Sequence, residues 1–91
     1  MWTNERLTRL RAELGAALVV LGYRCSVPIS CAQAAALVGK EAAAWRGWAC
    51  EARNPPKALW PILELFEAPN STVAHWAALV LGLDMWKNEQ A

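Results

Sequence analysis

The spacing of apolar residues along the chain predicts helices from end to end. In the N-terminal quarter, leucines recur at intervals of three and four residues and form one apolar stripe: Leu7, Leu10, Leu14, Leu18 and Leu21. This interval matches the period of an α-helix. Thr3 and Asn4 are suitable N-caps and Gly22 is a suitable stop, so we expect the first helix to occupy this stretch.

Four further helices are expected in the rest of the chain. Ser30 opens the second with Gln33 three residues later, the pattern of a capping box, and Val38–Gly39 ends it. The third is expected from about Glu41 to the breaker Asn54-Pro55-Pro56. The others are expected over about 57–67 and 72–82, and the tail from residue 83 either extends the last helix or frays. The fold class is therefore all-α, a compact bundle of about five helices in a single domain over residues 1–91.

The second and third helices have the spacing of a helix-turn-helix. Ala35 falls where the first helix of such a pair must be small, and Gly39, four residues later, falls at the turn where positive φ is needed. Val38, Trp45 and Trp48 are apolar at the positions that dock the pair on the rest of a domain. This order and spacing predict a DNA-reading element.

The two sides of the third helix differ in character. Trp45 and Trp48 share one side with alanines, and we expect both indoles to be buried against the first and fourth helices. The other side is expected to face DNA and comprises Ala43, Arg46, Gly47, Cys50 and Arg53. Arginine binds guanine O6 and N7 as a fork, and small neighbours let the backbone approach the groove. In the alternative interpretation, the arginines are solvated and Gly47 makes room beside Trp48.

Three polar residues near this helix pair are candidates for phosphate contacts. Gln33 lies in the first turn of the second helix, Lys40 lies in the turn, and Lys57 follows the proline pair. Each is also explained as a cap or a solvated surface charge.

The charge distribution agrees with this placement. Residues 24–57 carry a net charge of +3, whereas residues 58–91 carry −3, although the whole chain carries only +1. Phosphate contact requires a basic surface, so we expect the acidic segment to face away from DNA.

The C-terminal segment, about residues 70–91, is expected to form a dimer interface. The chain is 56% hydrophobic and holds six tryptophans, more than a small monomer usually hides. The fifth helix is apolar almost all round, and the first four helices can cover Val73, Ala77 and Val80. The strip left for a second copy comprises Trp76, Leu79, Leu83 and Trp86. Alternatively, the tail folds back over this strip.

Other classes of protein fit the sequence poorly. The longest apolar run is too short for a membrane span and no signal peptide opens the chain, so we expect a cytoplasmic protein. The potential zinc ligands Cys25, Cys31, Cys50 and His75 have irregular spacing without a C-x-x-C knuckle. We therefore expect no metal, no cofactor, no small-molecule ligand and no enzymatic activity.

The segment 30–66 also resembles a known family. The residues that carry the resemblance are Ala34, Ala35, Leu37, Gly39, Trp45 and Trp48, then Arg53-Asn54-Pro55-Pro56 and the apolar stretch 59–66. They are similar to the Cro/repressor-type helix-turn-helix of phage and plasmid regulators, particularly the small autoregulators encoded beside anti-CRISPR genes. The chain departs from that pattern at Lys40, at the spacing of Glu51 from Trp48, and in lacking a Gly before Arg53. The resemblance implies a homodimer that binds an inverted repeat in a promoter.

The sequence therefore predicts a dimeric regulator of transcription that binds double-stranded DNA and represses its own promoter. The alternative is a small protein-interaction module or inhibitor without DNA binding. Salt-dependent retention on duplex DNA separates these two functions.

Overall fold

Helix α1 (Asn4–Val20) is the element around which the other helices are arranged. The computed structural model describes residues 1–85. In this range α1 is followed by α2 (Cys31–Leu37), α3 (Ala42–Ala49), the 3-10 turn η1 (Lys57–Leu59), α4 (Trp60–Glu67) and α5 (Ser71–Leu81). The predicted all-α bundle of five helices is confirmed. None of the described helices is long and apolar enough to cross a membrane.

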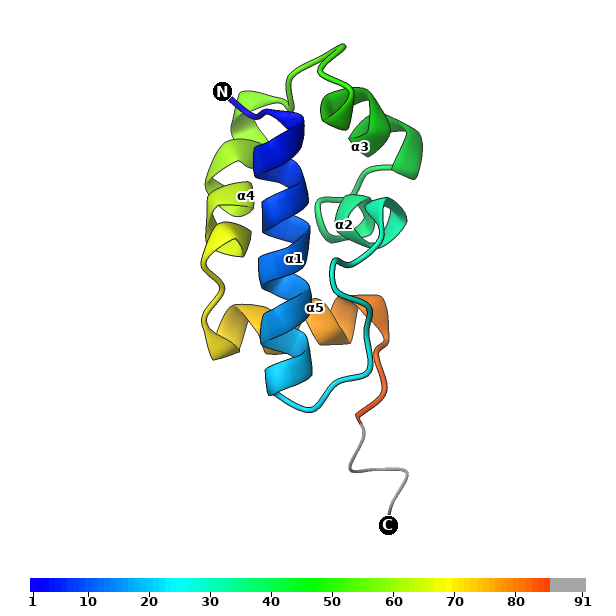
Figure 1. Cartoon of the computed structure of the whole chain (residues 1–91), viewed down its shortest axis with the longest axis vertical. Helices are drawn as coiled ribbons and strands as arrows, with labels where there is room; N and C mark the ends of the chain where they lie inside the picture. Colours follow the sequence, from blue (N-terminus) through cyan, green and yellow to red (C-terminus); the bar gives the residue numbers. More distant parts are fainter. Residues whose placement is uncertain (86–91) are drawn as a thin grey trace.

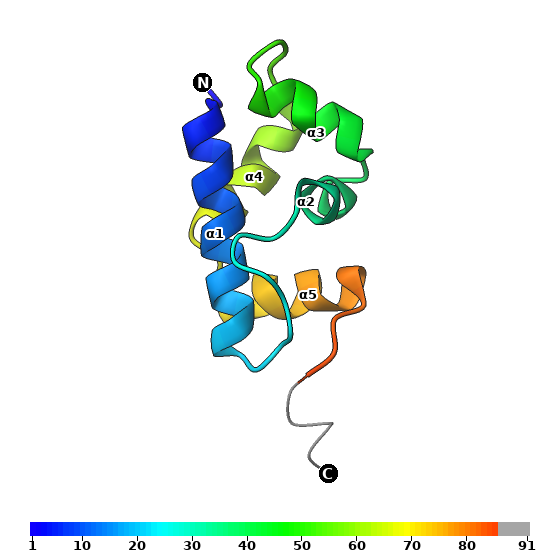
Figure 2. The ribbon, with the colours of Figure 1, turned by 45° about the vertical axis from the view of Figure 1, so that its right-hand side comes forward.

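The helices lie on two sides of α1 and across one of its ends. Figure 1 shows α4 beside α1 on one side and the α2–α3 pair on the other, with α5 crossing the lower end, and Figure 2 shows the same arrangement after rotation. α1 packs against α3, α4 and α5, while α2 packs against α3 and α5. The arrangement leaves α3 at the opposite end of the molecule from α5.

The predicted leucine stripe forms the centre of the core. Leu7, Leu10, Leu14 and Leu18 are buried, and Leu21 is half-buried at the C-cap. The N-cap is Thr3, whose Oγ1 accepts a hydrogen bond from the backbone N–H of Arg6. Both the start and the buried face of α1 are therefore as the sequence predicts.

The N-terminus is anchored by an interaction that links α1 to α4. Trp2 is buried, and the guanidinium of Arg6 lies 3.6 Å from the centre of its ring. The same guanidinium donates to both carboxylate oxygens of Glu67, at 2.6 and 2.8 Å. These hydrogen bonds raise the pKa of Arg6 above its ordinary value. A bidentate pair fixes geometry as well as adding energy, so it sets how α4 lies against α1.

The end of α5 is tied to the loop that follows α1. Gly82 ends the helix with φ of 64°, and an antiparallel bridge then pairs Tyr23 with Met85. The Tyr23 hydroxyl and His75 Nδ1 are 2.7 Å apart, within hydrogen-bond distance, which joins the same loop to the exposed side of α5. The chain is thus no longer helical over residues 83–85.

Candidate nucleic-acid interface

The α2–turn–α3 segment is built by local capping and by small buried residues. Ser30 and Gln33 form the predicted capping box: each side chain accepts a hydrogen bond of 3.0 Å from the other's backbone N–H. Ala34 and Ala35 are buried, so α3 can pack close to α2. Gly39 has φ of 69°, as predicted for the turn.

The two tryptophans of α3 are buried as predicted. Trp45 is 0% exposed and Trp48 is 4% exposed, and their ring centres are 5.6 Å apart. α3 packs against α1, as expected, and against α2, whereas α4, the other expected neighbour, is not one of its main contacts. The indole N–H of Trp45 is buried without a hydrogen-bond partner within residues 1–85. These contacts turn the opposite side of α3, with Ala43 and Arg46, toward solvent.

The prediction for the end of α3 is wrong by one helical turn. The helix stops at Ala49, Cys50 is the C-cap, and Glu51 has a left-handed conformation with φ of 61°. The backbone N–H of Glu51 donates to Trp48 O and that of Ala52 donates to Gly47 O, which is the Schellman arrangement. This motif usually has glycine where Glu51 stands, so the sequence carries no stop signal there.

A contact with α1 accompanies the unusual conformation of Glu51. Its Oε2 accepts a hydrogen bond of 3.1 Å from the backbone N–H of Asn4, in the first turn of α1. A carboxylate is favoured at a helix N-terminus, so this bond offsets the cost of a left-handed non-glycine residue. Sequence reasoning missed this role because the two residues are far apart in the chain.

The shorter helix changes the placement of two predicted DNA contacts. Cys50 caps α3 rather than lying within it, and Arg53 lies in the loop that follows. Arg46 and Arg53 therefore do not lie two turns apart on one face of α3. The Arg53 side chain instead folds back over Gly47. A Cβ added at Gly47 would lie 2.6 Å from Arg53 Nη2 and 3.3 Å from Arg53 Cζ. The space over Gly47, expected to be open toward DNA, is therefore occupied by the Arg53 guanidinium.

Apart from Arg24, which also interacts within the chain, the cations of residues 1–85 fall into two groups. On α1, Arg6 pairs with Glu67, Arg9 pairs with Glu5, and Arg11 donates to Ile29 O. A second group is exposed and makes no side-chain hydrogen bond or ion pair within the described residues: Lys40, Arg46, Arg53 and Lys57. This second group lies on the turn before α3, on α3, on the loop after it and at the start of η1.

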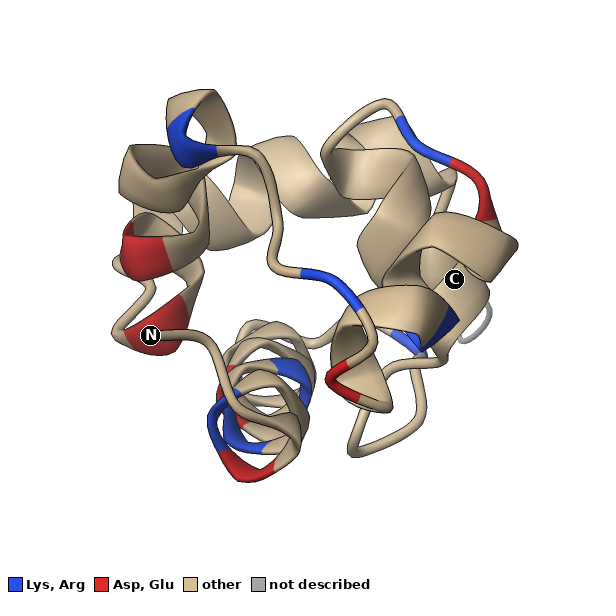
Figure 3. Ribbon diagram, turned by 90° about the horizontal axis from the view of Figure 1, so that it is seen from above, with Lys and Arg blue, Asp and Glu red and all other residues tan. Residues whose placement is uncertain are grey.

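The end of the molecule that carries these cations also carries carboxylates. Figure 3 looks onto this end and shows both Lys or Arg segments and Asp or Glu segments. Glu41 is the N-cap of α3 and its side chain makes no capping bond, whereas Glu51 is engaged by Asn4. Gln33 is half-buried and its Oε1 is held in the capping box, which leaves its amide nitrogen as the group available for a phosphate.

The predicted dimer strip is only partly exposed. Trp76 is 44% exposed and Leu79 is 80% exposed, in agreement with the prediction. Leu83 instead packs against the core, and Trp86 lies outside the described residues. Val80, expected to be covered by the first four helices, is 46% exposed. The exposed apolar face of α5 therefore comprises Trp76, Leu79 and Val80.

A groove between α4 and α5 adjoins this face. It has a volume of about 370 Å³ and is lined by Ile62, Leu65, Phe66, Thr72, Val73 and Trp76. Trp76 stacks on Phe66 with ring centres 6.1 Å apart, so one indole face is covered from within the chain. The groove and the exposed face of α5 share Trp76 and together form an apolar surface.

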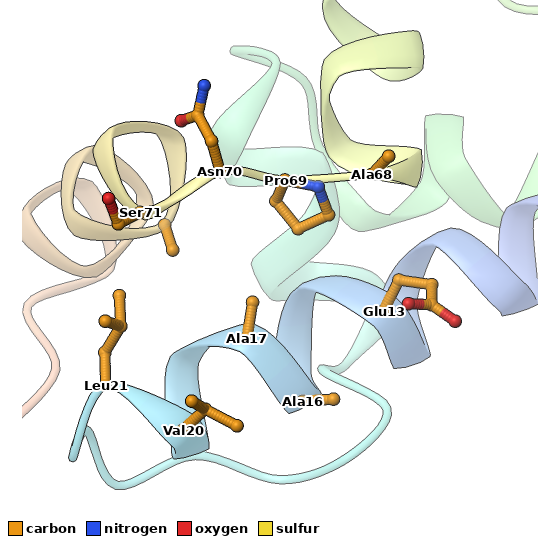
Figure 4. Close-up of a pocket in the computed structure, with 10 residues that line it drawn as sticks. Glu13, Ala16, Ala17, Val20, Leu21, Ala68, Pro69, Asn70 and Ser71 are labelled. Carbon is orange, nitrogen blue, oxygen red and sulfur yellow. The ribbon is translucent and has the colours of Figure 1, made fainter.

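A larger groove, of about 490 Å³, lies between α1 and the α4–α5 connection. Figure 4 shows small side chains of α1, among them Ala16 and Ala17, opposite the segment from Ala68 to Ser71, with Glu13 at one end. Asn70 Oδ1 caps α5 by accepting a hydrogen bond from Val73 N. The lining thus carries a single ionisable group, Glu13.

The cysteines and the histidine lie apart. Within residues 1–85, no three His, Cys, Asp or Glu side chains gather in a way that could hold a metal ion. Cys25, Cys31 and Cys50 are free thiols, and burial raises the pKa of Cys25. The thiolate is the metal-binding and nucleophilic form, so this shift makes Cys25 less reactive.

Comparison with models of protein families, with curated proteins and with solved structures finds no match for this chain.

Proposed function

We propose that this protein is a sequence-specific DNA-binding regulator of transcription, acting as a homodimer on an inverted repeat in a promoter. The observation that carries the proposal is the group of cations around α3 whose side chains have no ion-pair or hydrogen-bond partner within residues 1–85: Lys40, Arg46, Arg53 and Lys57. Cations on α1 are used within the chain, whereas these four offer their donors to an external acceptor. The phosphates and base edges of DNA are acceptors of this kind.

The dimensions of α3 support contact with the major groove. An α-helix with its side chains is about 10–12 Å across, close to the width of that groove, and the eight residues of α3 give about two turns to lie in it. Arg46 lies on the exposed side of the helix, between Lys40 before it and Lys57 after the following loop. In this pose Arg46 contacts base edges, while the two lysines contact phosphates on either side.

The apolar surface of α4 and α5 supports the dimer. Trp76, Leu79 and Val80 adjoin the groove that contains Leu65, which is 55% exposed. A second copy covers such a surface through a two-fold axis, the commonest symmetry of soluble oligomers. To bind an inverted repeat, the two α3 helices of such a dimer must lie about 34 Å apart, in successive major grooves. A regulator of the phage or plasmid type acts where its promoter lies, which is the cytoplasm of the bacterial host, and we propose that location for this protein.

Selection from a random duplex library tests the proposal. The expected result is enrichment of an inverted repeat with half-sites about one helical turn apart. The same selection with Arg46→Ala is expected to lose the preference at one base pair of each half-site. Failure of the parent protein to enrich any sequence contradicts the proposal.

A second function is favoured by the groove between α4 and α5. Its lining is apolar, and Ile62, Leu65 and Trp76 are all exposed. A protein-interaction module or inhibitor, acting without DNA, uses such a groove to hold an apolar segment of another protein. Substitution of Leu65 by Glu abolishes that activity, whereas Arg46→Ala leaves it unchanged.

A further inference from the structure

We infer that Gly47 and the left-handed turn at Glu51 seat the guanidinium of Arg53 across α3, so that Arg53 and Arg46 together select two guanines in each half-site. Arg53 is then a specificity-determining residue and Gly47 is a positioning residue. The inference rests on the proposed function and deepens it, because it names the bases read by the surface.

The seat is visible in the packing around Gly47. An ideal Cβ at this position would lie 2.6 Å from Arg53 Nη2, 3.2 Å from Nε and 3.3 Å from Cζ. Three guanidinium atoms at such distances from one point show that the group covers the Cα of Gly47. Only a residue without a side chain leaves room for it.

The backbone that carries Arg53 is held at several points. Ala52 N and Arg53 N both lie within hydrogen-bond distance of Gly47 O, at 3.1 and 3.4 Å. Glu51 is held by Asn4, and farther along the loop Pro55 O accepts a hydrogen bond of 2.9 Å from Trp60 Nε1. The loop is therefore fixed to α1 before Arg53 and to α4 after it.

The N–H groups of the Arg53 guanidinium are available to an external acceptor. Arg53 is exposed, and within residues 1–85 no side chain or carbonyl accepts a hydrogen bond from its guanidinium. A planar fork that lies over Gly47 and has no acceptor within the described residues is suited to a planar pair of acceptors, which guanine presents as O6 and N7. Arg46 is the neighbour of Gly47 in sequence and is also exposed, so one guanidinium comes from α3 and a second, from the following loop, lies over the residue next to it.

A double-mutant cycle tests the inference with the full chain. Affinity is measured for the selected duplex and for its single-base-pair variants with the parent, Gly47→Ala, Arg53→Ala and the double mutant. Each single substitution is expected to weaken binding by about 5- to 150-fold and to relax selection at the same guanine. The double mutant is expected to bind no more weakly than Arg53→Ala, because the added methyl then meets no guanidinium.

Two controls separate this role from loss of charge and from misfolding. Lys57→Ala removes one cation outside the seat and is expected to weaken binding to all duplexes alike. The melting temperature of Gly47→Ala is expected to equal or exceed that of the parent, because the end of the Arg53 side chain can move aside and alanine favours helix.

A measurement without DNA tests the seat by itself. The heteronuclear NOE of the Arg53 Nε–H is expected to report an ordered group in the parent and a mobile one in Gly47→Ala. A mobile Arg53 side chain in the parent would refute the placement of its guanidinium over Gly47. If the parent selects no DNA sequence, the proposed function and the role of Arg53 in base recognition are both refuted. The NOE of Arg53 Nε–H still shows whether its guanidinium is ordered over Gly47. If the parent selects a sequence but the two substitutions act additively, the inference alone is overturned.

Discussion

Two glycines of this chain lie within helices, and the atoms near each determine what a methyl group does there. At Gly15 an added Cβ would lie 2.7 Å from the backbone oxygen of Ser26, in the loop that crosses α1. At Gly47 the nearest atom belongs to the end of the Arg53 side chain. The backbone cannot move aside as a long side chain can. We therefore expect the same substitution to have opposite effects on the free energy of unfolding at the two positions.

We therefore expect Gly15→Ala to lower the free energy of unfolding by about 1–3 kcal/mol, as overpacking usually does. Gly47→Ala is expected to leave it unchanged or to raise it by up to about 1 kcal/mol, through helix propensity. Urea denaturation followed by far-UV circular dichroism measures both. A Gly47→Ala protein less stable than the parent contradicts the account of this position.

Arg46 and Lys57 are both unpaired cations, but the proposed pose gives them different acceptors. Arg46→Ala is expected to cost about 1–3 kcal/mol of binding free energy on the selected duplex, with little loss on unrelated DNA. Lys57→Ala is expected to weaken binding to both kinds of DNA and to reduce the salt slope by about two, because one phosphate contact is lost from each protomer of the dimer. Fluorescence anisotropy titrations give these values, and identical profiles for the two variants would remove Arg46 from the base contacts.

At the scale of elements, periodicity and capping explain why most of the fold is predictable. The N-caps Thr3, Ser30 and Asn70 each accept a side-chain hydrogen bond from a backbone N–H three residues later, so these helix starts depend on neighbouring residues in the sequence. The end of α3 cannot be predicted from neighbouring residues, because Glu51 has a left-handed conformation and its hydrogen-bond partner Asn4 is 47 residues away. The placement of Arg53 over Gly47 depends on that turn and was unpredictable for the same reason.

The burial of α3 predicts a contrast between tryptophans. Trp45→Ala is expected to cost about 3–5 kcal/mol, a large share of the stability of a domain this small, because the side chain is 0% exposed. Trp76→Ala makes the same change at a side chain that is 44% exposed, so we expect a clearly smaller loss. Denaturant unfolding at low protein concentration compares the two, and equal losses would contradict the assigned core.

At the scale of the whole molecule, α3 and α5 lie toward opposite ends of α1 (Figure 1). We expect the double substitution Trp76→Glu, Leu79→Glu to convert a dimer into a folded monomer, since it places charge on the exposed apolar face. Val20→Glu alters another apolar side chain, 84% exposed on α1, and is expected to leave the dimer intact. Sedimentation velocity measures both, and a parent that is monomeric at micromolar concentration refutes the dimer.

The salt dependence of binding to the protein's own upstream DNA tests the central claim most directly. With two to four phosphate contacts from each protomer, the logarithm of the binding constant is expected to fall linearly with the logarithm of salt concentration, with a slope of about −4 to −7 for a dimer. At each salt concentration we expect tighter binding to this duplex than to an unrelated one. Binding that is independent of salt, or equal for the two duplexes, would contradict a sequence-specific DNA-binding function.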